Sequence, residues 1–150
     1  MIVACAFDHA GVPLRDRLLP LVESLGHEVI DLGTDSTEPI DYPVKALEVG
    51  RAIVSGRAER GILVCGSGAG VSVAAGKIRG IRAATIHDTY TAHQGVEHDG
   101  VNVLCLGARV IGSEAAAEIV AAFLGAQISD EERHARRRSE VDEIERTGGE

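Results

Sequence analysis

Tryptophan is absent from this chain of 150 residues, and tyrosine and phenylalanine occur only twice each. So small a supply of aromatic rings argues against a stacking platform for single-stranded nucleic acid. The net charge of −8 also makes non-specific binding to DNA or to an anionic membrane unfavourable. We therefore expect no nucleic-acid partner and no membrane association.

Cysteine is scarce too, since Cys5, Cys65 and Cys105 are the only three and form no CxxC pair. This spacing suits neither a disulfide framework nor a zinc site, and no HExxH or comparable histidine spacing occurs. No apolar run is long enough to span a bilayer, and the first residues do not resemble a signal peptide. These absences predict a reduced, cytoplasmic protein with no metal and no other cofactor.

Short apolar runs alternate with amphipathic segments along the chain, which is the pattern of a parallel sheet covered by helices. The expected strands are residues 2–7, 27–32, 61–65, 81–86 and 102–106. The expected helices are residues 12–25, 44–54, a segment ending near 77, 88–96, 113–124 and 130–146. Residues 1–150 are thus predicted to form one α/β domain, a Rossmann-like three-layer αβα sandwich with a five-stranded parallel sheet.

Polar residues gather where the expected strands end, and ligands of such sheets bind beyond the carboxyl ends of the strands. Each residue alone also has a structural explanation, as Asp88 does if it caps the following helix. Their common location is what predicts a binding site. The residues concerned are Asp8, His9, Cys65, Ser67, His87, Asp88 and Arg109.

The run Cys65-Gly-Ser-Gly-Ala-Gly70 follows the third expected strand. Its glycines allow a tight turn whose successive N–H groups point at one spot, which makes an anion site. No Lys-Ser/Thr pair follows, so it is not a P-loop, and Val71 replaces the last glycine of a dinucleotide fingerprint. Cys65 is either a small core residue or a base or nucleophile. Cys5 and Cys105 are expected in the core.

Two further groups also have structural alternatives. His98 lies in a polar stretch before the last expected strand, where it is otherwise a solvated loop histidine. Arg133 and Arg137 lie one helical turn apart and therefore share a face. They form either a phosphate clamp or a solvated face paired with Glu140 and Glu143.

In their order and spacing these motifs resemble the type B ribose-5-phosphate isomerases, in the sugar-phosphate isomerase family that includes galactose-6-phosphate isomerase. The resemblance covers nearly the whole chain. Its markers are Asp8-His9-Ala10-Gly11, Asp41-Tyr42-Pro43, Cys65-Gly-Ser-Gly-Ala-Gly70, Ala74-Ala75-Gly76-Lys77, His98, Gly107-Ala108-Arg109-Val110-Ile111-Gly112 and Arg133-His134-Ala135-Arg136-Arg137.

The resemblance implies a metal-free aldose–ketose isomerase of a phosphorylated sugar, which is an intramolecular oxidoreductase. His98 and Asp8 help to open the sugar ring. A base then takes the proton from C2 to give an enediolate and returns it to C1. Some relatives use a thiol at the position of Cys65 and others a carboxylate at that of Val71, so this chain resembles the cysteine type. Ser67 and the amides of the turn would hold the oxyanion.

The same resemblance implies the substrate-binding positions. The phosphate contacts are His9, Arg109, Arg133 and Arg137. The sugar pocket and oxyanion contacts are Tyr42, Gly66, Gly68, Ala69 and Gly70. Relatives are dimers or tetramers whose active sites combine two subunits, so we expect a homodimer or homotetramer. The helix at about 130–146 would complete the phosphate site or a dimer contact.

Asp99 departs from the pattern, because relatives usually have Asn after this histidine. An acidic side chain near the sugar hydroxyls can change which sugar is accepted. Ribose 5-phosphate is the expected substrate, with erythrulose 4-phosphate and galactose 6-phosphate as alternatives. A non-catalytic sugar-phosphate-binding protein is a further alternative. A nucleotide-binding module would need an acidic residue after the next strand, which His87-Asp88 supplies only loosely.

Overall fold

The computed structural model describes residues 1–150 and contains one parallel sheet. The strands are β1 (Ile2–Phe7), β2 (Glu28–Asp31), β3 (Arg60–Cys65), β4 (Ala83–Thr85) and β5 (Val103–Gly107). They lie in the order β2-β1-β3-β5-β4, and every neighbouring pair is parallel. The predicted five-stranded parallel sheet is confirmed.

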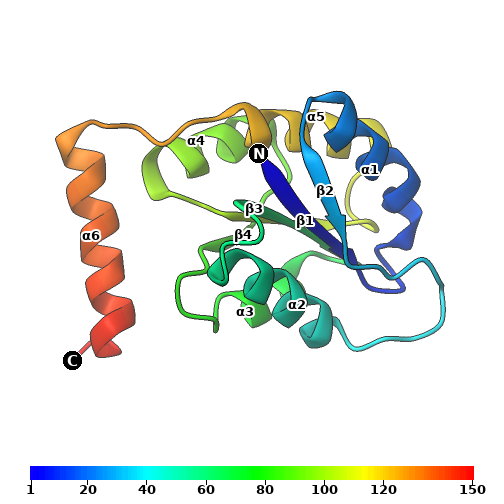
Figure 1. The fold of residues 1–150 in the computed structure, drawn as a ribbon, viewed down its shortest axis with the longest axis horizontal. Coiled ribbons are helices and arrows are strands. Elements are labelled where there is room, and N and C mark those ends of the chain that lie inside the picture. The colour runs from blue at the N-terminus through cyan, green and yellow to red at the C-terminus, as the bar shows by residue number, and fades with distance from the viewer.

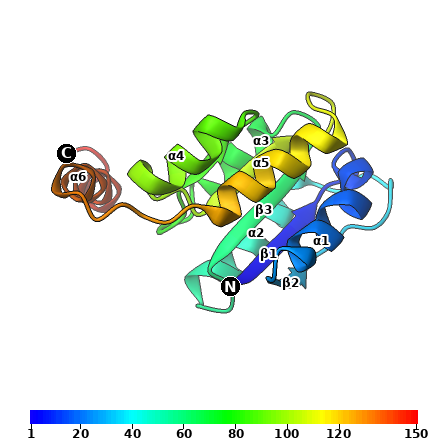
Figure 2. The same ribbon diagram turned by 90° about the horizontal axis from the view of Figure 1, so that it is seen from above.

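Helices cover both faces of this sheet, as Figures 1 and 2 show. They are the short 3-10 helix η1 (Val12–Leu14), α1 (Arg15–Ser24), α2 (Tyr42–Val54), α3 (Ala69–Ala75), α4 (Thr89–Asp99), α5 (Ser113–Gly125) and α6 (Glu132–Thr147). Helices α1, α4 and α5 form one layer, and α2 and α3 form the other (Figure 1). The predicted three-layer αβα sandwich is therefore also confirmed. None of the helices is both long enough and apolar enough to cross a membrane.

Strand β3 shows why the sheet has a core on each side. Successive side chains of a strand point to opposite faces, so Ile62 and Val64 enter the larger core under α1, α4 and α5. Leu63 and Cys65 enter the smaller core under α2 and α3. The buried thiol of Cys65 therefore faces the α2–α3 layer at the carboxyl end of the strand.

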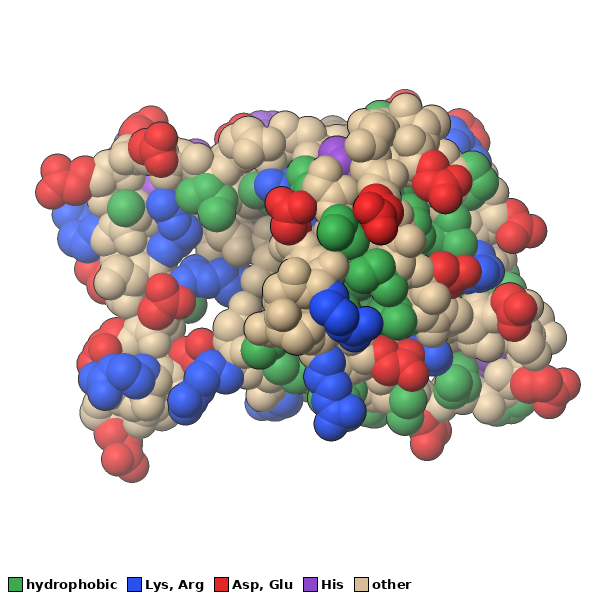
Figure 3. All heavy atoms as spheres, in the orientation of Figure 1, with side chains coloured by type: hydrophobic (Ala, Val, Ile, Leu, Met, Phe, Trp, Pro, Cys, Tyr) green, Lys and Arg blue, Asp and Glu red, His purple; other side chains and the backbone are tan.

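Helix α6 stands apart from the sandwich and lies beside α4 (Figures 1 and 2). Basic and acidic side chains alternate over its surface, seen at the left of Figure 3. Two of its apolar residues have little cover, since Val141 is 49% and Ile144 60% exposed. A helix with an exposed apolar side is typical of a surface that another element covers.

Two boundaries differ from the expectation in a way that affects the site. The helix predicted at 88–96 continues to Asp99, so His98 lies in its last turn and the alternative of a solvated loop histidine was wrong. Gly100, with φ of 69°, ends the helix in the left-handed conformation that glycine favours. Tyr42 and Pro43, which precede the helix predicted at 44–54, form the first turn of α2, where proline is well tolerated.

Candidate active site

The turn after β1 is organised by Asp8. Its buried carboxylate accepts hydrogen bonds at Oδ1 from the backbone N–H groups of Ala10 and Gly11, both at 2.9 Å. The next residue, His9, accepts at Nδ1 from the N–H of Ile40 at 3.2 Å. A neutral imidazole that accepts at Nδ1 carries its proton on Nε2. His9 is thus fixed as a donor through its other ring nitrogen.

The turn after β3 wraps around the sulfur of Cys65. The N–H of Gly68 donates to Cys65 Sγ at 3.1 Å, and the φ of 81° at Gly68 requires glycine. Thr85 Oγ1 donates to the carbonyl of Gly68 at 2.9 Å and holds the turn against the sheet. A Cβ on Gly107 would lie 2.6 Å from the carbonyl carbon of Ser67, so the turn packs directly on the end of β5.

These two turns border an open cavity of about 380 Å³ at the carboxyl edge of the sheet. It lies where the strand order reverses between β1 and β3, which is the usual ligand position in such sheets. The N–H groups of Gly66, Ser67 and Gly70 have no acceptor within the chain. They are available to an anion. The cavity is lined by Asp8, His9, Ala10, Tyr42, Cys65, Gly66, Ser67, Gly70, Arg109 and Val110.

Arg109 and Tyr42 approach this cavity from two other elements. The N–H of Arg109 donates to the carbonyl of Gly66 at 3.0 Å, which anchors the segment after β5 to the turn. No carboxylate pairs with the exposed guanidinium of Arg109. The ring of Tyr42 lies against Gly70, where a Cβ would come within 3.0 Å of it. The unpaired guanidinium of Arg109 and the phenol of Tyr42 therefore border the cavity that contains the Cys65 thiol.

A second polar cluster lies between α4 and α6. The ring of His98 stacks on the ring of His134 with centroids 3.8 Å apart and planes at 13°. His134 is 3% exposed, and burial, followed by the charges of His98 and Arg133, lowers its pKa below the ordinary value. Arg133 pairs with Glu131, and no acidic partner engages Arg137.

The solvated-face alternative for the arginines predicted other pairs. Glu140 instead pairs with Arg136, and Glu143 with Arg146. The expected pairing of Arg133 and Arg137 with these two glutamates was therefore wrong.

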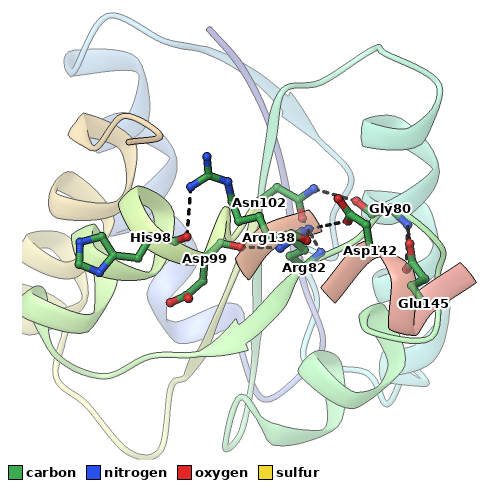
Figure 4. Close-up of polar contacts among 8 residues, drawn as sticks. All are labelled: Gly80, Arg82, His98, Asp99, Asn102, Arg138, Asp142 and Glu145. Carbon is green, nitrogen blue, oxygen red and sulfur yellow. Dashed lines mark hydrogen bonds and ion pairs between the residues drawn. The ribbon is translucent and has the colours of Figure 1, made fainter. Parts of the chain in front are cut away.

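Two more arginines hold α6 in place, as Figure 4 shows. Arg138 donates to the backbone carbonyl of His98 at 3.2 Å. Arg82 donates to the carbonyl of Asp99 at 2.8 Å and also contacts the carboxylate of Asp142. Guanidinium groups thus satisfy carbonyls at the end of α4 that have no partner within the helix. A larger cavity of about 510 Å³, lined on one side by Val141 and Ile144 of α6, adjoins this network.

The cavity lies at the carboxyl ends of the strands, and the α4–α6 cluster lies at their amino ends, the opposite edge of the sheet. Cys65 pairs with Gly107, the last residue of β5. Arg82 and Asn102, which border the α4–α6 cluster, directly precede β4 and β5. The five residues of β5 span roughly 16 Å at about 3.3 Å per residue. A single copy of the chain therefore does not bring His98, Asp99, Arg133 or Arg137 to Cys65.

The remaining strand-end residues have structural roles. Burial raises the pKa of both Cys5 and Cys105 to about 12, which confirms them as core residues. Asp88 accepts from the N–H of Thr91 at 2.7 Å, which confirms it as the cap of α4. His87 Nε2 accepts from the N–H of Gly107 at 2.9 Å and so supports the end of β5.

The family model described as Ribose/Galactose Isomerase matches residues 3–141 of the sequence. The chain belongs to this family. Ribose-5-phosphate isomerase B of Escherichia coli is 44% identical over 125 residues, which are 83% of this chain and 84% of that protein. D-erythrulose-4-phosphate isomerase of Pectobacterium atrosepticum is 41% identical over 127 residues, which are 83% of each.

A solved structure of the same family also shares the fold of this chain. The structure of ribose-5-phosphate isomerase B from Clostridium thermocellum matches with a TM-score of 0.94 at 40% identity, covering 99% of both chains. The resemblance seen in the sequence motifs and the predicted fold are thereby confirmed.

Proposed function

We propose that this chain isomerises a phosphorylated aldose to its ketose, with ribose 5-phosphate and ribulose 5-phosphate as the substrate pair. The observation that carries the proposal is the Cys65 thiol in a cavity beside backbone N–H groups with no partner. An aldose–ketose isomerisation needs this combination of a base and an oxyanion site. No cofactor enters the proposed chemistry.

The proposed reaction moves one proton between neighbouring carbons. The Cys65 thiolate takes the proton from C2, and the electrons of the C2–H bond form the C1=C2 double bond while the C1 oxygen becomes an oxyanion. The thiol then protonates C1 as the C2 hydroxyl passes its proton to the C1 oxyanion and becomes the new carbonyl. The N–H of Gly68 at 3.1 Å stabilises negative charge on the sulfur. The free N–H groups of Ser67 and Gly70 do the same for the oxyanion.

We place the phosphate between His9 and the arginines. His9 presents its Nε2–H, and the unpaired guanidinium of Arg109 lies on the same cavity. Charge-assisted hydrogen bonds of this kind are short and strong, and they hold the sugar at its unreactive end. Tyr42 then borders the sugar on the side of Gly70.

We also propose that the chain acts as a homo-oligomer, with a homodimer as the smallest unit. The α4–α6 cluster of one copy would complete the cavity of another, so that the partner subunit's His98, Arg133 and Arg137 reach the substrate. Three observations support this: the clusters lie at opposite edges of one copy, Arg137 has no acidic partner, and α6 exposes apolar side chains.

Asp99 bears on the choice of sugar. Its side chain is exposed and forms no ion pair, so it is free to contact sugar hydroxyls. A family member named D-erythrulose-4-phosphate isomerase is nearly as similar as the ribose-5-phosphate isomerase of Escherichia coli. We therefore keep erythrulose 4-phosphate as the second candidate. The three cysteines are free and buried, which fits a reducing cytoplasm.

The test is an isomerisation assay over four-, five- and six-carbon aldose and ketose phosphates, run together with the Cys65→Ala variant. The parent is expected to turn over ribose 5-phosphate fastest and to exchange its C2 hydrogen with deuterated solvent, as followed by NMR. In Cys65→Ala, the rates of turnover and of C2 hydrogen exchange should both fall by a factor of about 10² to 10⁴, the contribution of a general base.

A measurement of phosphosugar binding distinguishes the possible outcomes of this assay. The folded variant should still bind a phosphosugar inhibitor with nearly unchanged affinity. C2 exchange at near the parent rate would remove Cys65 as the base and make Asp8 the next candidate. If the parent binds phosphosugars but turns none over, the protein is a binding protein and not an isomerase.

A further inference from the structure

Gln94 contacts the imidazole ring of His98. The two residues lie one turn apart on α4, and Gln94 Nε2 is 2.8 Å from His98 Nδ1. An amide nitrogen can only donate a hydrogen bond, so Nδ1 of His98 accepts it. The neutral imidazole then carries its proton on Nε2. His98 is therefore held as a hydrogen-bond donor through the ring nitrogen that Gln94 does not occupy.

His134 fixes the plane of the same ring. Its imidazole is stacked on that of His98 at 3.8 Å and 13°, and it is nearly completely buried. Its Nε2 has no hydrogen-bond partner, and the nearest carboxylate oxygen, on Glu131, is 3.8 Å away. A buried ring without partners for its polar atom contributes its flat face and not a hydrogen bond.

Hydrogen bonds from α6 hold the backbone at His98. Arg138 of α6 donates to the carbonyls of His98 and Glu97 at 3.2 and 3.4 Å. Figure 4 shows the imidazole of His98 turned away from the network that Arg138 forms with Arg82 and Asp142. The ring is therefore anchored at its backbone, at Nδ1 and on one face. Its Nε2 forms no hydrogen bond within the chain.

We propose that Gln94 and His134 are positioning residues that hold His98 as a neutral Nε2–H donor for the opening of a cyclic sugar phosphate. The inference rests on the proposed function and on the role of His98 in it. In ring opening the C1–O4 bond breaks, the C1 hydroxyl loses its proton as C1=O forms, and O4 gains a proton. Asp8 is the carboxylate of the cavity that can carry this proton from one oxygen to the other. A neutral histidine that donates at O4 stabilises the negative charge developing there.

The decisive variant is Gln94→Glu, which keeps the size of the side chain but replaces the donor by an acceptor. The tautomer is read from the ¹⁵N shifts of His98 at about pH 9, well above the ordinary histidine pKa of about 6.5. The parent should show a protonated Nε2 and a bare Nδ1, whereas Gln94→Glu should show a protonated Nδ1. A parent spectrum with a protonated Nδ1 would overturn the proposal even if the variant fails to fold.

The kinetic measurement separates ring opening from isomerisation. Ribulose 5-phosphate cannot close a five-membered ring because its O5 carries the phosphate, so exchange of its C1 hydrogen with deuterated solvent needs no ring chemistry. At the same pH, Gln94→Glu should lower turnover of ribose 5-phosphate about tenfold or more, against the roughly 10²- to 10⁴-fold that a whole general acid contributes. The exchange rate should stay within about twofold. An unchanged ratio of the two rates would overturn the proposal.

Three further variants control this experiment. Gln127→Glu adds the same charge to the exposed segment before α6 and should change neither the tautomer nor the ratio. His134→Phe keeps a flat ring against His98 and should keep the parent's ratio of ribose 5-phosphate turnover to C1 exchange. His134→Leu should lower this ratio. Equal ratios in these two variants would remove His134 from the proposal. A parent without any turnover would instead refute the isomerase function, and the ¹⁵N spectra would still decide the tautomer.

Discussion

Mixing two inactive variants tests whether one active site is built from two copies of the chain. Cys65→Ala removes the thiol at the carboxyl edge of the sheet, and His98→Ala removes the imidazole at the opposite edge. Each homo-oligomer alone should be nearly inactive on ribose 5-phosphate. In a mixed dimer with shared sites, both substitutions fall in one site, and the other site is intact.

The expected recovery follows from counting the sites. At equal concentrations with free exchange about half of the dimers are mixed, and each contains one intact site of two, so activity should return to about a quarter of the parent value. The assay measures ketose formation before and after exchange under mild denaturant. Native mass spectrometry then shows the fraction of mixed dimers.

Three results of the mixing experiment have different meanings. Recovery in proportion to the mixed fraction supports the shared site. Proven exchange without recovery would refute it, and the roughly 16 Å between the two edges would then have to be closed within one copy, by a rearrangement of α4 and α6. A parent that remains monomeric at the assay concentration, yet is active, would refute it as well. The combination of Cys65→Ala with Cys65→Ser serves as the control, because neither partner supplies a thiol and no recovery is expected.

Three other predictions test separate parts of the site. Arg137→Ala should raise KM about ten- to hundredfold with little change in kcat, since a charge-assisted bond contributes about 1.5–3 kcal/mol. The control Arg136→Ala removes a guanidinium that pairs with Glu140 and should leave KM unchanged. Equal effects of the two variants in steady-state kinetics would refute the phosphate clamp. Exhaustive treatment with a chelator should leave turnover unchanged, because no three His, Cys, Asp or Glu side chains are grouped as metal ligands; loss of activity restored by a divalent ion would contradict this. Gly107→Ala should cost about 1–3 kcal/mol by overpacking and lower Tm in thermal unfolding, because its Cβ would lie 2.6 Å from Ser67; an unchanged Tm would show that the turn after β3 can move.

The strands and the cavity could be predicted because their signals are local. Apolar runs bounded by glycines identify buried strands, and the strand-end rule then places Asp8, His9 and Cys65 at one edge. The structure places these three on the same cavity. The end of α4 could not be predicted in this way. The polar residues 97–99 suggest a loop, but Arg138, about 40 positions later, satisfies the carbonyls of the last helical turn.

No local pattern in the sequence singles out Gln94 either. Its spacing of four residues from His98 is a helical signal, but this signal has meaning only when both residues lie in one helix. Once residues 97–99 are assigned to a loop, the relation disappears. His134 was part of a family marker, yet its stacking on His98 depends on how α6 packs against α4. Contacts between elements far apart in the chain are not visible in local patterns.

The separation of the two clusters follows from the fold itself. In a parallel sheet each connecting helix must return from the carboxyl edge to the amino edge. Helix α4 begins at Thr89, directly after its cap Asp88 and close to the end of β4, and it ends with His98 and Asp99 near the start of β5. A residue in the last turn of such a helix therefore lies far from the strand-end cavity of its own copy. If His98 and Cys65 act on the same sugar, two copies must meet with these edges facing one another, and α6, which leaves the sandwich beside α4, is the element placed to make that contact (Figure 1).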